Sequence, residues 1–451
     1  MAINALPFVA LIVLLAVFSF DKLIYLVVLL APLSVELSDL MSGLPINMFL
    51  PTEPILAGVL VLFLLKVLHE RTFDRDILLH PVSIVIYLNL FWILITSVTS
   101  TMPIVSVKFL LARVWFLVAF YFLASKLFRD GKNMEKYVWL YLAGFLVVIF
   151  YAIYRHWGYG LLDKRAAHFV VTPFYNDHTS YGAAIAMYLP FAVIFALNKE
   201  YTKRTRMIAW MILGILAIAF VLSYSRAAWL SVMVAIGAWV ILKLHIRFRT
   251  IMAIVGSFLM IAFVFQHEIV TYLERNSDES SSNLTEHFSS MTNISTDASN
   301  LERLNRWNSA LSMFKEKPVF GYGPGTYMFQ YAKYQLKKDR TIISTNAGDG
   351  GNAHSEYLGP LSESGVGGLV TFLLIILVVF YTGVNTWLRV EDKRLKGIVL
   401  AALLGLITYY IHGFLNNFLD TDKLSVPFWG FTAMIVVIDL HSRKVLRQKE
   451  L

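Results

Sequence analysis

Long apolar runs, separated by short polar connections, make up most of the chain. Many approach the ~20 residues that a helix needs to cross a bilayer, where backbone polar groups can be satisfied only in helices or closed barrels. The pattern predicts an all-α polytopic membrane protein with spans at roughly 54–68, 80–98, 104–124, 137–154, 179–197, 206–222, 227–243, 250–266, 364–387, 395–414 and 425–440.

Residues 6–36 are also apolar, but Asp21 and Lys22 interrupt them. At about 1.5 Å per residue this stretch is too long for one straight span. Counted as one broken span, it completes about twelve transmembrane helices with both termini inside, whereas two spans would give about thirteen and an outside N-terminus. We favour about twelve. No basic region or small-residue cleavage pattern precedes the run, so we expect no cleaved signal peptide.

The composition agrees with this fold class. Hydrophobic residues make up 57% of the chain and charged residues 15%, whereas soluble domains are about 45–50% apolar and about 25% charged. A soluble enzyme, a disordered tail and a secreted disulfide scaffold are therefore excluded. The chain has no cysteine, which excludes disulfides, thiol nucleophiles and cysteine-ligated metals.

The net charge of +9 comes from Lys and Arg that gather in short clusters between the apolar runs, at 66–76, 126–136, 199–206, 243–249, 389–396 and 441–449. Connections such as 38–53 and 98–107 contain no Lys or Arg. Because cytoplasmic loops carry the excess of Lys and Arg, the clusters predict the cytoplasmic side of the membrane. The basic charge thus follows from topology, and we expect no nucleic-acid partner.

Residues 268–363 form the longest polar segment, and the predicted topology places them outside the cytoplasm. We therefore expect N-terminal transmembrane helices over 1–267, a long periplasmic loop over 268–363 and C-terminal transmembrane helices over 364–451. The stretch 276–300 is rich in Ser, Thr and Asn, which is typical of mobile chain.

An amphipathic helix is predicted over 301–316, before Pro318. Its apolar positions recur at three- and four-residue spacing: Leu301, Leu304, Trp307, Leu311 and Phe314. Arg303 and Arg306 are three residues apart on this helix and share roughly one face. They are either solvated, paired with Glu302, or available to a ligand.

Further candidate residues lie on the same predicted side. Arg226, in SYSRAA at 223–228, is at the outer boundary, where the positive-inside bias makes an arginine unexpected unless it snorkels to the interface. His354 lies in a glycine-rich loop shortly before a span. Glu356 and Glu363 could orient its imidazole or be ordinary surface acids. GYGPG at 321–325 resembles a phosphate loop superficially, but no strand precedes it, which favours a turn.

Two Asp-x-Asp patterns could suggest a metal-dependent sugar-nucleotide transferase. Asp74 and Asp76 lie in a basic loop with no catalytic domain around them, and Asp420 and Asp422 lie in a short external connection. Such short patterns arise easily by chance, so we expect neither a metal nor another cofactor. Arg113 lies within a span, where a charge is costly, and we expect it to face the bundle interior.

In combination, these motifs resemble the O-antigen ligase and polymerase superfamily. The resemblance covers roughly residues 54–440 and includes the order of the motifs, the topology and the single long external loop. It rests on SYSRA at 223–227, Arg303 with Trp307, GYGPG at 321–325, His354-Ser355-Glu356 and SESGVGGL at 362–369.

The resemblance implies a membrane glycosyltransferase of the bacterial inner membrane with its active site facing the periplasm. The implied donor is a glycan on undecaprenyl diphosphate, and the implied transfer is inverting and metal-independent. Lipid A–core is the acceptor of ligases, and another lipid-linked repeat unit is the acceptor of O-antigen, capsule or exopolysaccharide polymerases. We favour ligation, although the motifs are shared.

The resemblance also implies residue roles. Arg226 and Arg303 would bind the diphosphate, because the planar guanidinium pairs with phosphate oxygens. His354 would activate the acceptor, since its neutral form is available near neutral pH. Family members often carry Asn after this histidine, whereas Ser355 follows it here. Four further residues are expected to contact substrate: Arg165, His178, Arg306 and Glu356.

A transporter or flippase of lipid-linked oligosaccharide is the main alternative. It would require polar residues in several spans around a central cavity, but the spans are nearly uncharged apart from Arg113, and the sequence has no internal repeat. A nonenzymatic envelope scaffold would explain the basic topology but not three motifs on one side of the membrane.

Overall fold

The computed structural model describes residues 20–40, 48–70, 73–244, 298–335 and 351–449. The predicted span at 250–266, the first part of the apolar stretch 6–36 and most of the Ser-, Thr- and Asn-rich stretch 276–300 lie outside these residues.

The described residues are almost entirely helical, which confirms the all-α prediction. One short pair of antiparallel strands, β1 (Val35–Glu36) and β2 (Phe49–Leu50), accompanies the helices. The longer helices are α2 (Phe20–Leu30), α4 (Thr52–Glu70), α6 (Pro81–Val98), α7 (Pro103–Leu117), α9 (Gly131–Tyr159), α11 (His178–Leu197), α12 (Lys203–Leu222), α13 (Arg226–Lys243), α17 (Ala298–Glu316), α19 (Leu358–Arg389), α20 (Lys393–His412) and α21 (Asp422–Lys449).

Short helical turns complete the described fold. The α-helical turns are α3 (Leu37–Leu40), α5 (Arg75–Leu78), α8 (Ala124–Leu127), α10 (Lys164–Ala167) and α18 (Tyr327–Gln330). The 3₁₀ turns are η1 (Ala31–Leu33) and η3 (Tyr331–Tyr334), and η2 (Val118–Leu123) is a π-helical turn between α7 and α8.

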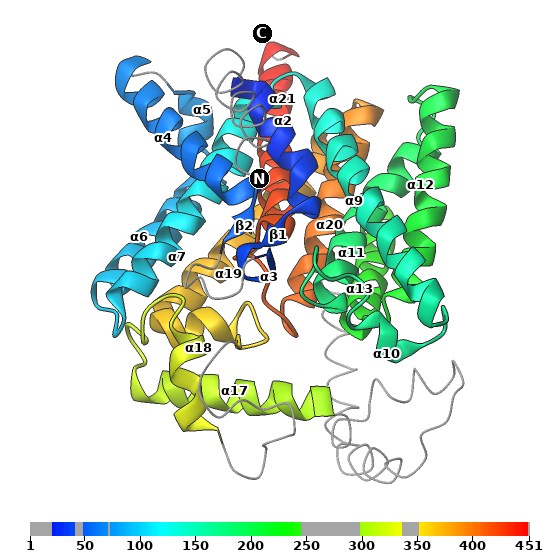
Figure 1. Cartoon of the computed structure of the whole chain (residues 1–451). Helices are drawn as coiled ribbons and strands as arrows, with labels where there is room; N and C mark the ends of the chain where they lie inside the picture. Colours follow the sequence, from blue (N-terminus) through cyan, green and yellow to red (C-terminus); the bar gives the residue numbers. More distant parts are fainter. Residues whose placement is uncertain (1–19, 41–47, 71–72, 245–297, 336–350, 450–451) are drawn as a thin grey trace, which may run out of the picture.

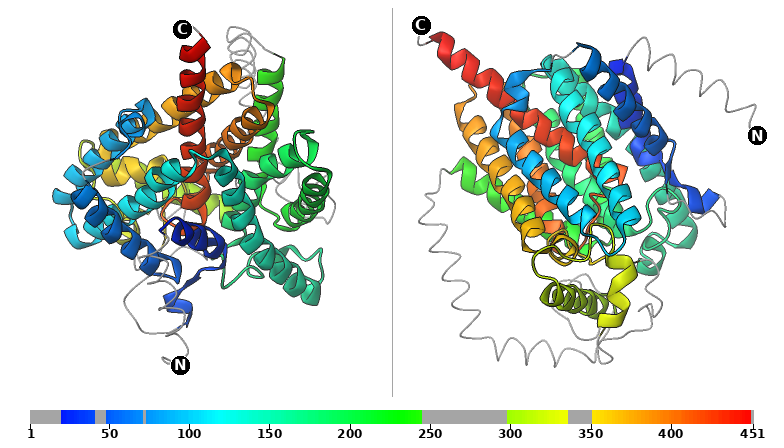
Figure 2. Two further views of the ribbon diagram at one scale, coloured as in Figure 1. Left: turned by 90° about the horizontal axis from the view of Figure 1, so that it is seen from above. Right: turned by 90° about the vertical axis from the view of Figure 1, so that its left-hand side faces the viewer.

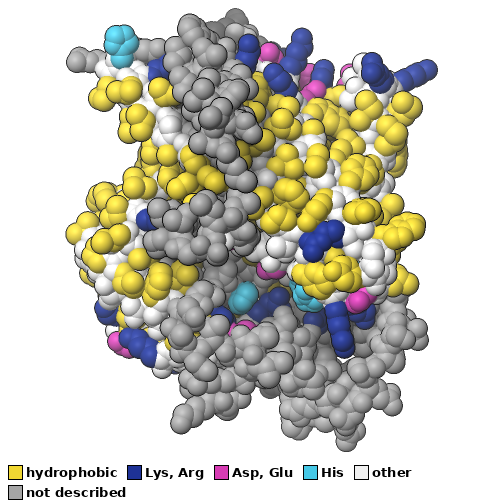
Figure 3. Space-filling model, viewed as in Figure 1, with side chains coloured by type: hydrophobic (Ala, Val, Ile, Leu, Met, Phe, Trp, Pro, Cys, Tyr) yellow, Lys and Arg dark blue, Asp and Glu magenta, His cyan; other side chains and the backbone are white. Residues whose placement is uncertain are grey.

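Ten helices within the described residues are long and apolar enough to cross a membrane. They coincide with predicted spans: α4, α6, α7 with its continuation to Leu127, α9, α11, α12, α13, α19, α20 and α21. The protein is therefore a multi-pass membrane protein. On the face shown in Figure 3, hydrophobic side chains cover the middle of the molecule, and charged side chains gather above and below it.

The helices run between two ends that differ in charge. At the basic end, the predicted Lys and Arg clusters join α8 to α9, α11 to α12 and α19 to α20. At the opposite end, which we call the α17 end, helix α17 lies crosswise to the spans (Figures 1 and 2). The chain thus separates its basic loops from the segment that carries α17.

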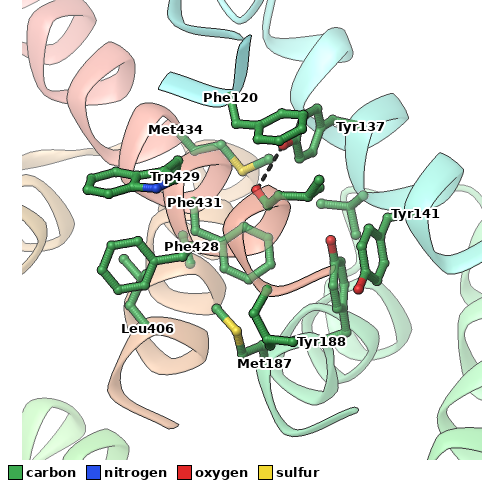
Figure 4. Packing of buried hydrophobic residues seen from close by; sticks show 14 of the residues in the cluster. Phe120, Tyr137, Tyr141, Met187, Tyr188, Leu406, Phe428, Trp429, Phe431 and Met434 are labelled. Carbon is green, nitrogen blue, oxygen red and sulfur yellow. Dashed lines mark hydrogen bonds between the residues drawn. The ribbon is translucent and has the colours of Figure 1, made fainter. Parts of the chain in front are cut away.

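Helices α11, α20 and α21 form the centre of the bundle, and most of their side chains are buried within the protein. Aromatic and aliphatic side chains of α9, α11, α20 and α21 interlock there, and the Tyr137 hydroxyl donates a hydrogen bond of 2.8 Å to the Val426 carbonyl (Figure 4). The Tyr141 hydroxyl likewise donates at 2.8 Å to the Lys423 carbonyl, which lacks its usual helix donor because Pro427, four residues later in α21, has no N–H.

Buried carboxylates hold α21 near both of its ends. Toward the basic end, the Asp439 carboxylate accepts from Thr386 and Arg389 of α19 at 3.0 and 2.8 Å. At the other end, Asp422 accepts from the Thr52 hydroxyl of α4 and lies 3.4 Å from the Lys423 ammonium. Each buried charge therefore has partners, as burial in a low-dielectric interior requires.

Helix α17 confirms the predicted amphipathic helix but not its orientation. The predicted apolar positions that can be described are half-buried or, for Leu311, exposed. The buried side instead carries Glu302, Asn305, Arg306, Ser309, Ala310 and Met313. This side packs on a small separate hydrophobic cluster that includes Tyr322, Tyr327 and Tyr331. The orientation differs because the cluster offers hydrogen-bonding groups as well as apolar surface.

The GYGPG motif at 321–325 forms a turn, as predicted, and its three glycines have positive φ angles. It docks on a kink in α19 at Gly365, where φ is 65° and ψ is −165°. The Val366 amide, which the kink removes from the helix ladder, donates instead to the Pro318 carbonyl at 2.9 Å. The segment after α17 is thus bonded directly to a membrane-spanning helix.

Gly144→Ala should destabilise the protein, because a Cβ at Gly144 of α9 would lie 2.1 Å from the Leu29 carbonyl oxygen of α2. Overpacking of this kind costs typically ~1–3 kcal/mol. Gly158→Ala is the matched control, since nothing lies within 4 Å of a Cβ at that position of the same helix. Thermal unfolding of both variants in detergent checks this. Equal melting temperatures would contradict the close packing of α2 on α9.

Candidate active site

Three membrane-spanning helices meet at the α17 end and bring polar residues together. His178 is the first residue of α11, Arg226 the first of α13, and His412 the last of α20. Helix α11 packs along α20, and α20 along α13. Asp177 caps α11 by accepting from the Thr179 amide at 2.7 Å, and Ser225 caps α13. These caps fix where the helices start and hence where His178 and Arg226 lie.

Helix α17 adds a fourth element to this site. The Arg303 Nε donates to the Leu415 carbonyl at 3.3 Å, in the connection after α20. One turn later, the Trp307 indole donates to the His354 carbonyl at 3.3 Å. Arg303 and Trp307 therefore hold α17 against both the 351–357 loop and the connection after α20.

The charges of the site act on one another. Arg303 lies within electrostatic range of the imidazoles of His178, His354 and His412. Arg226 also acts on His178. The structure thus brings His354, Arg303, His178 and Arg226 into one group, which we call the histidine–arginine cluster and which includes His412. Two guanidinium groups, of Arg226 at the start of α13 and of Arg303 on α17, make it a place where an anion would be stabilised.

His354 has an unusual backbone and an altered pKa. Its φ is +48°, in the left-handed region that histidine tolerates better than most residues. Its amide donates to the Asn352 side-chain oxygen at 3.1 Å. Burial, followed by the charges of Arg303 and Arg306, lowers the pKa of the imidazole to about 4. His354 is therefore neutral at neutral pH and able to accept a proton.

Two histidines of this region were not predicted as site residues. His412 is buried, and its Nε2 lies 3.1 Å from the Asn416 side-chain nitrogen. The ring of His168 lies 4.1 Å, centroid to centroid, from that of His178. The only sequence signal for His412 is a histidine at the end of a span, and His168 carries none, because the contact depends on how the 163–177 loop folds back.

Arg306 has a different environment from Arg303. It is buried, and its Nε donates to the Glu302 carboxylate at 2.6 Å, which is the pairing considered as an alternative above. Its guanidinium lies 4.1 Å from the Tyr331 ring centroid and packs against the backbone of Gly351. These contacts place Arg306 between α17 and the start of the 351–357 loop, where it supports the loop that carries His354.

Glu356 is buried and faces away from solvent. Its Oε1 accepts from the Tyr409 hydroxyl at 2.5 Å and from the amides of Phe418 and Leu419 at 2.7 and 2.9 Å. Its own amide donates to the Gly413 carbonyl at 2.8 Å. Glu356 therefore ties the His354 loop to the connection after α20, rather than orienting an imidazole.

The remaining candidates lie apart. Arg165 is exposed on α10, and no contact described for its side chain joins it to the cluster. Glu363 accepts from the Tyr327 amide at 2.9 Å and so anchors the turn after α17.

Asp420 is exposed, whereas Asp422 is fully buried beside Lys423, so the two do not share a site. Among the described residues, no group of three or more His, Asp or Glu is arranged to hold a metal.

The fold and site define a multi-pass membrane protein with a cationic, histidine-containing site at one end of its spans. Residues 211–373 match the family described as O-antigen ligase. This part of the chain is therefore an O-antigen ligase family domain, and the family implies a membrane glycosyltransferase. The matched residues include Arg226, Arg303 and His354, whereas His178 and His412 lie outside them.

The chain is also similar to an uncharacterized protein of Haemophilus influenzae (strain ATCC 51907 / DSM 11121 / KW20 / Rd). The two are 25% identical over 261 residues, which cover 54% of this chain and 59% of that protein. The similarity thus spans less than two thirds of the relative's length.

We expect the His354 imidazole to titrate at about pH 4 in the folded protein. Arg303→Gln should raise this pKa, because loss of a nearby positive charge favours the protonated imidazole. NMR of histidine-labelled protein measures the titration, and His354→Asn identifies the signal. Arg447→Gln, at the exposed C-terminal end of α21, is the control and should change nothing. A pKa near 6.5, or one insensitive to Arg303→Gln, would contradict this electrostatic description.

Proposed function

We propose that this protein is an inverting, metal-independent membrane glycosyltransferase that ligates O-antigen to lipid A–core. Its donor is the glycan on undecaprenyl diphosphate, at the outer leaflet of the bacterial inner membrane, and its active site faces the periplasm. In this proposal residues 1–267 and 364–451 form the transmembrane part, and 268–363 form the periplasmic loop.

The observation that carries the proposal is the histidine–arginine cluster. Arg226 at the start of α13, Arg303 of α17 and the neutral His354 of the 351–357 loop lie at the α17 end of the bundle, within the O-antigen ligase family domain. A lipid-linked diphosphate has its charge at the membrane–water boundary, where such a cluster can stabilise it. The basic clusters at the other end of the bundle support a periplasmic orientation of the site.

The proposed reaction is a single displacement. The acceptor hydroxyl oxygen attacks the anomeric carbon, and the bond from that carbon to the diphosphate oxygen breaks. Undecaprenyl diphosphate leaves with the electron pair, and Arg226 and Arg303 stabilise its charge. The hydroxyl proton passes to His354. A bound diphosphate adds negative charge beside this imidazole, which raises its pKa from the low value of the free protein and makes it a stronger base.

The other candidates take supporting roles in this proposal. His178 lies in the cluster and contacts the donor. Arg306 and Glu356 position the His354 loop through Glu302 and through Tyr409, respectively. Arg165 contacts the glycan of the donor only if that glycan extends over α10.

A transfer assay tests the function directly. Purified protein in nanodiscs receives undecaprenyl-diphosphate glycan, with lipid A–core and a second lipid-linked repeat unit offered as separate acceptors. We expect glycan on lipid A–core, release of undecaprenyl diphosphate, and nearly the same rate in EDTA, because arginines rather than a metal stabilise the leaving group.

Three other results would each correct one part of the proposal: the acceptor, the absence of a metal, or the reaction itself. Transfer only to the second repeat unit would make the protein a polymerase. Activity that EDTA abolishes and Mg²⁺ or Mn²⁺ restores would show that a metal takes part. Movement of the lipid-linked glycan across the bilayer, without transfer to either acceptor, would make it a transporter.

Replacing His354 should lower turnover about 10²–10⁴-fold and leave donor binding nearly intact, since a general base acts in the chemical step. His354→Ala removes the imidazole. His354→Asn removes it as well, but asparagine tolerates the left-handed backbone conformation of this position. His354→Gly avoids backbone strain and leaves space, so added imidazole should partly restore its rate. His441→Ala, at the basic end, is the control. A folded His354→Asn variant with wild-type turnover would make this histidine structural.

Arg226→Lys should weaken both donor binding and turnover, because lysine keeps the charge but not the paired donor geometry. Arg303→Lys should lower turnover more than ground-state binding if α17 closes on the bound donor. Donor binding and kcat measured separately for both variants distinguish these effects. Arg447→Lys, which is exposed at the far end of α21, should match the wild type.

A further inference from the structure

A second charged group lies within the bundle, apart from the histidine–arginine cluster. Arg113 is in the membrane-spanning helix α7 and is half-buried. Its guanidinium lies 5.4 Å from the Phe109 ring centroid of the same helix. Among the described residues it forms no hydrogen bond or ion pair. An arginine within a membrane-spanning helix is energetically costly unless its charge and its five N–H donors have a partner.

Arg113 lines a pocket between four membrane-spanning helices. Helices α6, α7, α19 and α21 form its walls, and the turn after α17 contributes Pro324. The walls are mostly apolar, with Ile93, Phe109, Phe372 and Trp429 among them, and the polar residues besides Arg113 are Asn89, Glu356, Glu363 and Ser364. The pocket therefore combines a mostly apolar lining with one cation and two carboxyl groups.

The two carboxylates of the pocket are already engaged by other donors. Glu356 accepts from a hydroxyl and two amides, and Glu363 accepts from the Tyr327 amide. The positive charge of Arg113 interacts electrostatically with both carboxyl groups, but Arg113 donates no hydrogen bond to either of them. Asn89 is occupied as well, since its Nδ2 donates to the Thr371 hydroxyl at 3.0 Å. Arg113 and the Trp429 indole, whose buried Nε1 has no partner among the described residues, are thus the donors of this pocket whose hydrogen-bonding capacity is unused.

We propose that the Arg113 pocket binds the anionic group, a phosphate or a carboxylate, of an amphiphilic molecule. The guanidinium would pair with the oxyanion, and the aromatic and aliphatic walls would hold the adjoining apolar part. The pocket is distinct from the diphosphate site, because its lining contains Glu356 but none of Arg226, Arg303 or His354. The proposal does not depend on the transfer reaction.

Lipid retention tests the proposal without any activity assay. The whole protein, purified in mild detergent, is incubated with dioleoyl phosphatidic acid or dioleoyl phosphatidylcholine, and native mass spectrometry measures bound lipid. We expect at least tenfold preference for phosphatidic acid in the wild type and its loss in Arg113→Gln. Lys108→Gln is the matched control, since it removes an exposed cation from the same helix outside the pocket, and it should keep the preference.

A second arm separates the two sources of the anion. Inorganic phosphate is added in place of the lipid, and the melting temperature of wild type and Arg113→Gln is measured. A higher melting temperature with phosphatidic acid but not with phosphate supports an amphiphilic ligand. An equal, Arg113-dependent rise with phosphate would show that the ligand is a soluble oxyanion. That result would overturn the proposal that the apolar walls hold part of the ligand.

Equal retention of phosphatidic acid by Arg113→Gln and wild type would overturn the whole proposal. If Arg113→Gln does not fold, Ile93→Phe takes its place, because it fills the pocket and leaves the charge. Retention should then fall at least several-fold. Unchanged retention in a folded Ile93→Phe protein would place the lipid elsewhere and refute the assignment.

Discussion

The bilayer allows no unpaired backbone group and few charges, and this constraint determines where the protein can carry chemistry. The spans are apolar, so the polar residues that they contribute to the site stand at their first or last positions. His178 and Arg226 begin α11 and α13, and His412 ends α20. Side-chain caps fix the starts of α11 and α13, so the placement of His178 and Arg226 depends on helix length and capping, whereas Arg303 and His354 come from α17 and the 351–357 loop.

The segment that carries α17 is held to the bundle by hydrogen bonds and charge instead of a broad apolar face. Arg303 and Trp307 donate to backbone carbonyls of two different connections. On the other side of α17, Arg306 pairs with Glu302 and stacks on Tyr331. Polar contacts of this kind fix orientation closely, because each donor must meet one acceptor. They therefore determine how α17 holds Arg303 relative to the 351–357 loop.

The spans and α17 could be predicted from the sequence because apolar length and helical periodicity are local properties. The packing side of α17 could not, since the helix buries Glu302 and Arg306 against Tyr331, Asn352 and the 351–357 loop, which are distant in sequence. For the same reason the sequence did not separate Arg303 from Arg306, or show that Glu356 bonds to Phe418 and Leu419. Motif order predicted a common region for the candidate residues, but only the fold distinguishes groups that face it from groups that support it.

The kink at Gly365 has a consequence for how the protein can diversify. The Val366 amide of α19 finds its acceptor in Pro318, outside the helix. The membrane-spanning helix is therefore incomplete without the segment that follows α17, and losing that segment would leave the Val366 amide without its acceptor. This segment is not an independent insert. A chimera that exchanges it between relatives would have to exchange the first turns of α19 with it, so the two would change together during divergence.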